Sequence, residues 1–184
     1  YEAGTHLAVL GHKVHPFYGT YAPTRVSHLE LFATWLSQYT GSKARAIDVG
    51  TGCGVLALML ARAGSTEIVA TDCNPNAVES VRRELLRLEN PPPIRPVDGD
   101  LLGPGDAVAD LVVFNPPWVQ GSISDLLDRA LTFEPGLFER FFDRAYERLS
   151  EAGRIVLVFS NMMQLVQPER PHPIRRELDG GRLR

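Results

Sequence analysis

The sequence predicts an α/β fold, a doubly wound and mostly parallel sheet with helices on both faces. Between residues 43 and 161, short apolar runs alternate with segments of helical periodicity. The apolar runs are hydrophobic almost throughout, which is typical of strands buried on both faces of a parallel sheet. Ligands of such sheets bind outside the carboxyl ends of the strands, so we expect the functional residues there.

The expected elements follow one another in regular order. A helix before residue 43 carries Leu29, Phe32, Leu36 and Tyr39 on one face, and another runs from 55 to 63 and is closed by a glycine. A third helix opens with Asn74 as N-cap and a proline at its first position. The last helix extends from 137 to 149 and is stopped by a glycine at 153. We expect strands at 44–49, 67–71, 94–97, 111–114 and 155–159.

Three parts are expected along the 184 residues. Residues 1–42 form an N-terminal segment and helix, 43–161 form the α/β core, and 162–184 form a proline-rich, partial C-terminal region. We interpret 167–184 as loop because of its prolines, charges and Gly-Gly pair. The chain begins without Met, and we expect both ends, including the C-terminal strands of the sheet, to be incomplete.

Composition narrows the class of protein. A net charge of -3 argues against a dedicated nucleic-acid surface, although it leaves an RNA or DNA substrate open. Cys53 and Cys73 are too few for a disulfide scaffold; we expect two small core thiols in a reducing, cytoplasmic compartment. The apolar runs are too short to span a membrane. The five histidines lack metal-ligand spacing with the cysteines, so no metal site is predicted.

The first predicted strand ends in a glycine-rich loop. The run is AIDVGTGCGVLAL, in which Asp48 ends the strand and Gly50, Thr51, Gly52 and Gly54 follow. Glycines allow a tight turn and close approach of a ligand, although many α/β proteins carry such loops for packing alone. The spacing is G-x-G-x-G rather than the dinucleotide pattern G-x-G-x-x-G. A carboxylate at this strand end would repel a pyrophosphate and attract a cationic, amino-bearing ligand.

Polar residues follow two further strands. Asp72 ends the second strand and can accept hydrogen bonds from a ribose diol, or it can be a surface residue that caps the next helix. Directly after the fourth strand stand Asn115, Pro116, Pro117 and Trp118. Two successive prolines make this loop stiff and leave carbonyl oxygens as its polar groups. A purely structural interpretation is a strand terminator with the tryptophan in the core.

DVGTGCG resembles the first motif of class I S-adenosylmethionine-dependent methyltransferases, and the resemblance extends over about residues 14–161. It implies that Asp48 and the loop residues Gly50, Thr51, Gly52 and Gly54 surround the methionine part of S-adenosylmethionine.

ATDCNPNAV and GDLL resemble further motifs of this family. They imply that Asp72 holds the ribose hydroxyls with Cys73 beside the adenosine. Asp100 would bind the adenine amino group with Leu101 against the ring, and Asp98 is the competing candidate.

The NPPW run resembles the (N/D)PP(Y/F/W) signature of methyltransferases that act on exocyclic amines of adenine or guanine, or on glutamine side-chain amides. The resemblance implies catalytic roles for Asn115, Pro116, Pro117 and Trp118. The Asn115 oxygen and the Pro116 carbonyl would accept the N–H hydrogens of a planar nitrogen, and the indole would stack on it. The expected acceptor is a protein glutamine, an RNA or DNA base, or a small molecule.

Upstream, HPFYGTYAPTRVSHLELF resembles the segment that covers the cofactor in small-domain nitrogen methyltransferases. It departs from the YxPxEDT pattern of eukaryotic-type release-factor enzymes, because Arg25 and Val26 stand where two acids are expected. Tyr18 and Tyr21 either line the acceptor pocket or are packing aromatics. Two alternatives to methyl transfer remain, an NAD-dependent oxidoreductase and a non-catalytic cofactor-binding subunit.

Overall fold

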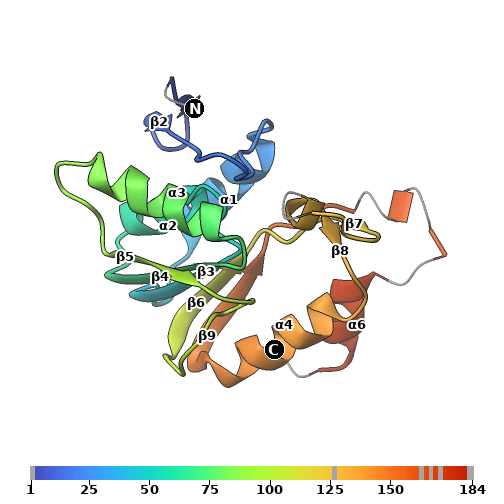
Figure 1. The fold of residues 1–184 in the computed structure, drawn as a ribbon. Helices are drawn as coiled ribbons and strands as arrows, with labels where there is room; N and C mark the ends of the chain where they lie inside the picture. Colours follow the sequence, from blue (N-terminus) through green and yellow to red (C-terminus); the bar gives the residue numbers. More distant parts are fainter. Residues whose placement is uncertain (1–2, 126–127, 162–163, 166–167, 170–171, 182–184) are drawn as a thin grey trace.

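The computed structural model describes residues 3–125, 128–161, 164–165, 168–169 and 172–181. A five-stranded sheet forms its centre (Figure 1). All neighbouring strands in it are parallel, as the apolar runs predicted. The strand order is β5-β4-β3-β6-β9, so the chain changes direction across the sheet between β3 and β6, where a ligand site is expected. The strands are β3 (Arg45–Val49), β4 (Glu67–Asp72), β5 (Ile94–Asp98), β6 (Ala109–Phe114) and β9 (Leu149–Leu157).

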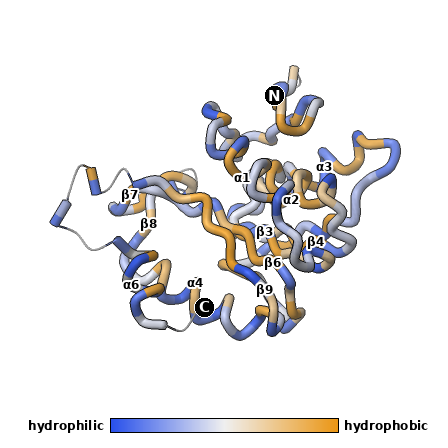
Figure 2. The backbone as a smooth tube through the Cα atoms, turned by 180° about the vertical axis from the view of Figure 1, so that it is seen from behind, coloured by the Kyte–Doolittle hydropathy of each residue, from blue (hydrophilic) through white to orange (hydrophobic). Residues whose placement is uncertain are grey.

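Helices cover both faces of the sheet, as predicted. One face packs against α1 (Ser27–Gln38), α2 (Val55–Arg62) and α3 (Pro75–Leu86), and the other against α4 (Leu137–Glu147). Successive strand residues point to opposite faces, so Ile68 belongs to the first hydrophobic cluster and Val69 to the second. Figure 2 shows hydrophobic residues concentrated along the central strands, in keeping with a sheet that is buried on both sides.

The predicted start of α3 is confirmed in detail. The Asn74 side-chain oxygen accepts a hydrogen bond from the Asn76 backbone N–H at 3.0 Å, and Pro75 is the first helical residue. The Asn74 side-chain nitrogen donates to the Gly19 carbonyl at 2.9 Å. One side chain therefore caps the helix and also holds a segment that lies 55 residues earlier in the chain.

The predicted extent of the last core helix is wrong. α4 ends at Glu147, and Leu149 begins β9, which pairs with Ala109 of β6. The predicted stop, Gly153, lies within this strand. The reason lies at Arg148, whose buried guanidinium donates to the carbonyls of Leu102, Gly103 and Ala107. These long-range bonds turn the chain toward the sheet, although the helical spacing of apolar residues continues past that point. Consequently β9 also starts earlier than the predicted 155–159 and ends at Leu157.

The prediction that residues 167–184 form a loop is wrong in part. A helix, α6 (Pro173–Asp179), forms where a proline occupies its first turn, a position that proline favours. Ile174 packs against the hydrophobic cluster between the sheet and α4. The centroids of the His172 and Phe159 rings are 5.4 Å apart. The helix thus gains its stability from contact with the core. The remaining residues of this stretch that fall at 167, 170–171 and 182–184 lie outside the described part.

An N-terminal hairpin and an extended segment precede α1; the sequence predicts the segment but not the hairpin. The hairpin consists of β1 (Thr5–Leu7) and β2 (His12–Val14). The segment after it runs along α3, where the Ser80 hydroxyl accepts from the Phe17 N–H at 3.0 Å and Glu84 accepts from the His15 N–H at 2.9 Å. The Arg83 guanidinium lies 4.0 Å from the centre of the Phe17 ring. Buried polar groups on α3 therefore fix the segment that leads to Tyr21.

Small elements connect β6 to α4. They are the paired strands β7 (Val119–Gln120) and β8 (Thr132–Phe133) and the short helix η1 (Asp128–Ala130). Figure 1 shows them together beside the sheet, on the side of α4. Within the described ranges, no helix has the length and hydrophobicity needed to cross a membrane.

Candidate active site

A cavity of about 180 Å³, partly open to solvent, lies at the carboxyl ends of β3, β4 and β6. This is the place that the strand order predicts for a ligand. Its lining draws on the glycine loop, the end of β4, the segment before α1 and the connection from β6 to α4. Residues used in the argument below that line it are Tyr21, His28, Gly50, Thr51, Gly52, Asp72, Cys73, Asp100, Leu101, Asn115, Pro117 and Arg129.

The glycine loop forms one wall of the cavity. Gly52 has a φ of 55°, and a Cβ placed there would lie 3.4 Å from the Tyr21 carbonyl oxygen. Thr51 donates its backbone N–H to the Thr71 carbonyl at 2.8 Å, so the loop is tied to β4. Gly54 does not line the cavity. It begins α2 with a φ of 84°, and a Cβ there would lie 3.0 Å from the Val81 side chain. The loop glycines thus serve both the ligand space and helix packing.

Asp48 lies beneath this loop and outside the cavity lining, in a fully buried position. Its Oδ2 accepts from the Thr51 hydroxyl at 2.6 Å and from the Ala57 N–H at 3.0 Å. Its Oδ1 has no hydrogen-bond partner among the described residues. Burial raises the pKa of this carboxyl to about 7, and the two hydrogen bonds oppose that shift. The side chain therefore supports the loop from below, through its hydrogen bonds to the Thr51 hydroxyl and the Ala57 N–H.

The raised pKa of Asp48 predicts how folding stability depends on pH. Between about pH 4 and pH 7 the folded protein binds more protons at this site than the unfolded chain does. The free energy of unfolding should therefore fall as pH rises through this range. Asp48→Asn removes the titration while keeping an oxygen acceptor, so we expect the variant to gain stability relative to the parent between pH 5 and pH 8. Urea unfolding at both pH values measures this gain.

The control for this measurement is Asp179→Asn, which changes an exposed carboxyl at the end of α6. We expect its stability difference from the parent to be the same at both pH values. An equally constant difference for Asp48→Asn would show that the buried carboxyl does not titrate in this range.

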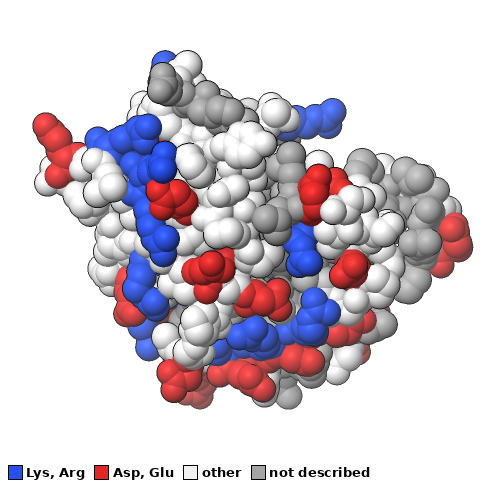
Figure 3. Space-filling model, viewed as in Figure 1, with Lys and Arg blue, Asp and Glu red and all other residues white. Residues whose placement is uncertain are grey.

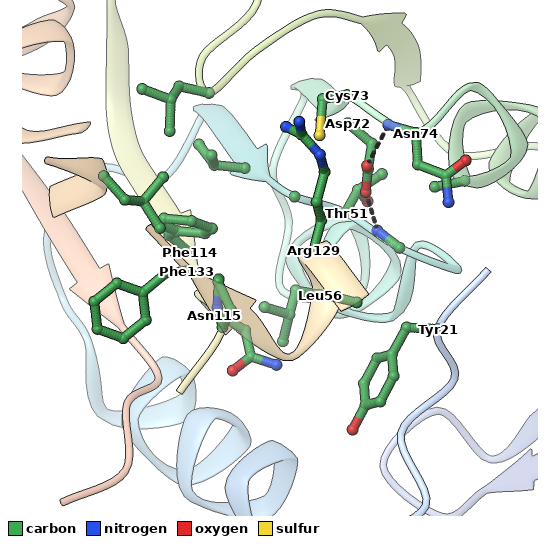
Figure 4. A pocket seen from close by; sticks show the side chains of 18 of the residues that line it. Tyr21, Thr51, Leu56, Asp72, Cys73, Asn74, Phe114, Asn115, Arg129 and Phe133 are labelled. Carbon is green, nitrogen blue, oxygen red and sulfur yellow. Dashed lines mark hydrogen bonds between the residues drawn. The ribbon is translucent and has the colours of Figure 1, made fainter. Parts of the chain in front are cut away.

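Asp72 joins the cavity wall at the end of β4. Its Oδ2 accepts from the Gly52 N–H at 2.9 Å and its Oδ1 from the Asn74 N–H at 2.8 Å (Figure 4). Burial raises the pKa of this carboxyl, and both backbone hydrogen bonds act in the opposite direction. Each oxygen keeps a second lone pair for a ligand. The residue is thus a rigid, pre-oriented hydrogen-bond acceptor rather than the exposed surface residue of the alternative interpretation.

The residues after β4 and β5 lie at the same end of the cavity. Cys73 is exposed beside Asp72 and lines the cavity, as do Asp100 and Leu101, whereas Asp98 does not. Leu101 is held at a φ of 51°, a region that residues other than glycine rarely adopt. Its carbonyl accepts from the Thr71 hydroxyl at 2.5 Å. The structure therefore places Asp100 and Leu101, the two residues that the GDLL motif indicated, together in the cavity lining.

The NPPW residues separate into two groups. Asn115 and Pro117 line the cavity, while Pro116 and Trp118 do not. The Asn115 Oδ1 is covered from solvent and has no partner among the described residues. The Trp118 indole N–H donates to the Val158 carbonyl at 3.2 Å, and its ring meets His28 edge-on with a centroid distance of 5.8 Å. The structure thus places the indole behind the cavity wall, and its stacking role stays a prediction.

Several lining residues come from segments that carry no recognised motif. Arg129 reaches the cavity from η1, and Figure 4 shows its side chain near Cys73. Its positive charge lowers the pKa of that thiol, although burial and nearby acids raise it overall. Tyr21 lines the cavity, whereas Tyr18 is 71% exposed. The sequence already indicates Tyr21 as a candidate pocket residue, whereas Arg129 could not be identified from composition or spacing because it approaches the site only through tertiary folding.

The two thiols differ in their surroundings. Both are free; Cys53 is buried, and burial raises its pKa to about 12. Cys73 is exposed at the cavity, so the prediction of a second core thiol is wrong. Across the described ranges, no group of three or more His, Cys, Asp or Glu side chains is arranged to hold a metal ion.

Charges of both signs share the face that contains the cavity. Figure 3 shows basic groups along the side where α3 lies and a mixture of acids and bases over the lower part of the view. The exposed arginines of α3 are Arg82 and Arg83, and Arg83 pairs with Glu79 at 2.7 Å. This face therefore carries a local basic edge within a mixed surface.

Comparison with known proteins identifies the family. A family model described as Methyltransferase small domain matches residues 27–168. The chain belongs to this family. The match includes the glycine loop, Asp72 and the NPPW run. The predicted α/β fold, with a parallel central sheet and helices on both faces, is thereby confirmed.

Two curated proteins illustrate the relatives of this methyltransferase small domain. The ribosomal protein L11 methyltransferase of Symbiobacterium thermophilum is 35% identical over 119 residues, which are 64% of this chain and 36% of that protein. The release factor glutamine methyltransferase of Deinococcus radiodurans is 36% identical over 96 residues, which are 52% of this chain and 34% of that protein. The chain thus spans about a third of the length of these relatives.

Solved structures support the same fold. A 16S rRNA N2 G1207 methyltransferase of T. thermophilus, solved with AdoMet and guanosine, aligns with a TM-score of 0.53 and 26% identity. The alignment covers 76% of this chain and 35% of that one. A Pyrococcus horikoshii protein aligns with a TM-score of 0.57 and 21% identity over 78% of this chain and 61% of that one, which supports the fold alone.

Proposed function

We propose that this methyltransferase small domain transfers a methyl group from S-adenosylmethionine to a planar nitrogen of an amide or exocyclic amine. The observation that supports it most is Asn115. This residue lines the cavity directly after β6, and its Oδ1 is buried without a hydrogen-bond partner among the described residues, in a chain whose relatives are methyltransferases of proteins and rRNA. The enzyme is proposed to act in the cytoplasm, where its free thiols stay reduced.

The residues of the cavity fit the cofactor. Asp72 offers two fixed carboxylate oxygens to a ribose diol, and Asp100 with Leu101 lies at the same end for the adenine. The glycine loop leaves space that a Cβ would fill, and the buried carboxyl of Asp48 would act on the methionine part only indirectly, by holding the loop in place. When bound, the cofactor would supply a methyl group activated on a positively charged sulfur. We propose that Gly50, Thr51, Gly52, Cys73 and Asn115 also contact the cofactor, and that Gly54 contributes through the packing of α2.

Binding of the nitrogen that receives the methyl group depends on two oxygen atoms of the protein that accept hydrogen bonds. An amide or aromatic amine nitrogen is a weak nucleophile because its lone pair is delocalised. The Asn115 oxygen and the Pro116 carbonyl would accept its two N–H hydrogens and favour the pyramidal nitrogen that attacks. Pro117 keeps the loop rigid, so these two protein oxygens are oriented before the substrate binds. Trp118 would fix the plane of the acceptor, either directly or through the residues it packs against.

The three-part division of the chain becomes a functional proposal. Residues 1–42 would cover the bound cofactor, because the segment before α1 is hydrogen-bonded to α3 and brings Tyr21 to the cavity. Residues 43–161 would carry the catalytic core, and 162–184 would belong to a partial C-terminal region. Family membership favours methyl transfer over hydride transfer with NAD, and a subunit without catalysis would have no need of Asn115 at the cavity.

Ligand binding tests the cofactor assignment. Titration calorimetry should show that the chain binds S-adenosylmethionine and S-adenosylhomocysteine and does not bind NAD, because the G-x-G-x-G loop with its acid suits a cationic methionine tail better than a pyrophosphate. Tight binding of NAD without binding of S-adenosylmethionine would contradict the proposal.

A labelling experiment tests the acceptor class. The protein is incubated with methyl-labelled S-adenosylmethionine and cell extract, and the product is divided into nuclease-treated and protease-treated halves. Loss of label in one half identifies nucleic acid or protein as the acceptor. Label confined to carbon or oxygen positions of the product would refute transfer to nitrogen.

A further inference from the structure

His28 lies in the cavity wall without any role in the proposed cofactor or acceptor contacts. It projects from the first turn of α1 and is only 8% exposed. Neither ring nitrogen has a hydrogen-bond partner among the described residues. The imidazole meets Trp118 edge-on, at an interplanar angle of 87°, and shares the cavity with Asn115. A histidine from the N-terminal part thus stands beside the residues that follow β6.

Two unpaired ring nitrogens in a buried position are unfavourable for the folded protein. A buried polar group without a partner destabilises the folded protein, and most such groups in proteins find one. Trp118 does not supply the missing bond, because its indole N–H already donates to the Val158 carbonyl. Asn115 lines the same cavity, and its Oδ1 is also buried without a partner in the described part of the chain. Two polar side chains at one site therefore have hydrogen-bonding atoms for which the described residues provide no partner.

The surroundings of His28 favour the neutral imidazole. Burial lowers its pKa, and no charged group in the described part of the chain contributes to the shift. A neutral imidazole carries one N–H donor and one nitrogen acceptor. It can therefore donate a hydrogen bond to an uncharged acceptor atom without the cost of burying a cation.

The proposed acceptors share a chemical feature that such a donor can recognise. In an amide, and in the amino-bearing edge of a nucleobase, the NH₂ group is attached to a carbon that also carries a carbonyl oxygen or an unprotonated ring nitrogen. We propose, resting on the proposed function, that His28 orients the acceptor by donating a hydrogen bond to this neighbouring atom. Asn115 would then hold the nitrogen itself, and the two side chains together would fix the acceptor in its plane.

The test compares His28→Phe with His28→Gln and with His12→Phe. Phenylalanine keeps the ring that packs on Trp118 and removes both nitrogens, and glutamine restores a donor and an acceptor. His12 also has an unpaired, buried Nδ1, but it does not line the cavity, which makes it a matched control. Each protein is saturated with S-adenosylhomocysteine, and binding of N-acetylglutamine methylamide, adenosine and guanosine is measured by NMR. The ¹⁵N shifts of the His28 ring are followed in the parent protein.

We expect at least one probe to bind the parent and to move one His28 ring-nitrogen resonance. Its affinity should fall about tenfold in His28→Phe, recover in part in His28→Gln and stay unchanged in His12→Phe. S-adenosylhomocysteine should bind all four proteins equally, which shows that they are folded. Unchanged probe affinity in His28→Phe, or no binding of any probe to a parent that binds S-adenosylhomocysteine, would overturn the role of His28 alone. Failure of S-adenosylhomocysteine to bind the parent would contradict the proposed function itself.

Discussion

Asn115→Ala should lower the rate of methyl transfer by roughly 100-fold while leaving the dissociation constant of S-adenosylmethionine within about threefold of the parent value. The magnitude is that of losing one oriented hydrogen-bonding group whose contact strengthens in the transition state. Asn115 lines the cavity and its Oδ1 is buried without a partner, so the substitution removes no hydrogen bond to that oxygen among the described residues. Turnover is measured with the acceptor fraction found by labelling, and cofactor affinity by calorimetry.

Asn90→Ala is the matched control for this substitution. Asn90 is an exposed asparagine between α3 and β5, remote from the cavity lining. It should leave both quantities unchanged. If Asn115→Ala turned over at the parental rate, hydrogen bonding to the nitrogen would not be the source of catalysis, and an oxygen or carbon acceptor would have to be considered.

Asp72→Ala should weaken binding of S-adenosylmethionine by roughly 1–3 kcal/mol, which corresponds to about 5- to 150-fold in the dissociation constant. Two effects contribute. The carboxylate would lose its hydrogen bonds to the ribose, and the Gly52 and Asn74 N–H groups would lose the acceptor that holds the loop and the start of α3 together. Calorimetry at pH 7.5 measures the change.

Asp98→Ala separates a specific effect from a general loss of negative charge. Asp98 is paired in register with Asp72 on the neighbouring strand, but it is exposed and does not line the cavity. We expect its affinity for the cofactor to match that of the parent. Equal affinities of Asp72→Ala and the parent would show that the ribose is held elsewhere.

The core of the fold could be predicted where local signals and long-range packing agree. Strands buried on both faces need apolar residues throughout, and Asn74 with Pro75 marks a helix start whatever surrounds it. Prediction failed where a group far away in the sequence determines the local structure. The helical spacing that leads to Leu149 is genuine, but the carbonyls that bind the Arg148 guanidinium lie more than 40 residues earlier in the chain.

The same distinction explains the site. Asp72 and Asn115 could be found because the carboxyl ends of parallel strands meet at one edge of the sheet. The position of Asp48 beneath the loop depends on which side of β3 its side chain faces, and that of Trp118 depends on a carbonyl 40 residues later. His28 lies in the segment that resembles the family's covering segment, but its type and spacing give no role, and Arg129 lies outside any motif, so only the assembled structure reveals that they share the cavity.

The strand order also makes the two halves of the cavity separable for protein engineering. Asp72, Cys73, Asp100 and Leu101 follow β4 and β5, on one side of the point where the chain changes direction. The residues proposed to meet the acceptor follow β6 or lie before α1 and in its first turn, on segments that come from elsewhere in the sequence. Exchanging residues 20–29 together with 115–134 between members of the family should therefore transfer the preference for a methyl acceptor. The residues proposed to bind the nucleoside part of the cofactor would remain unchanged.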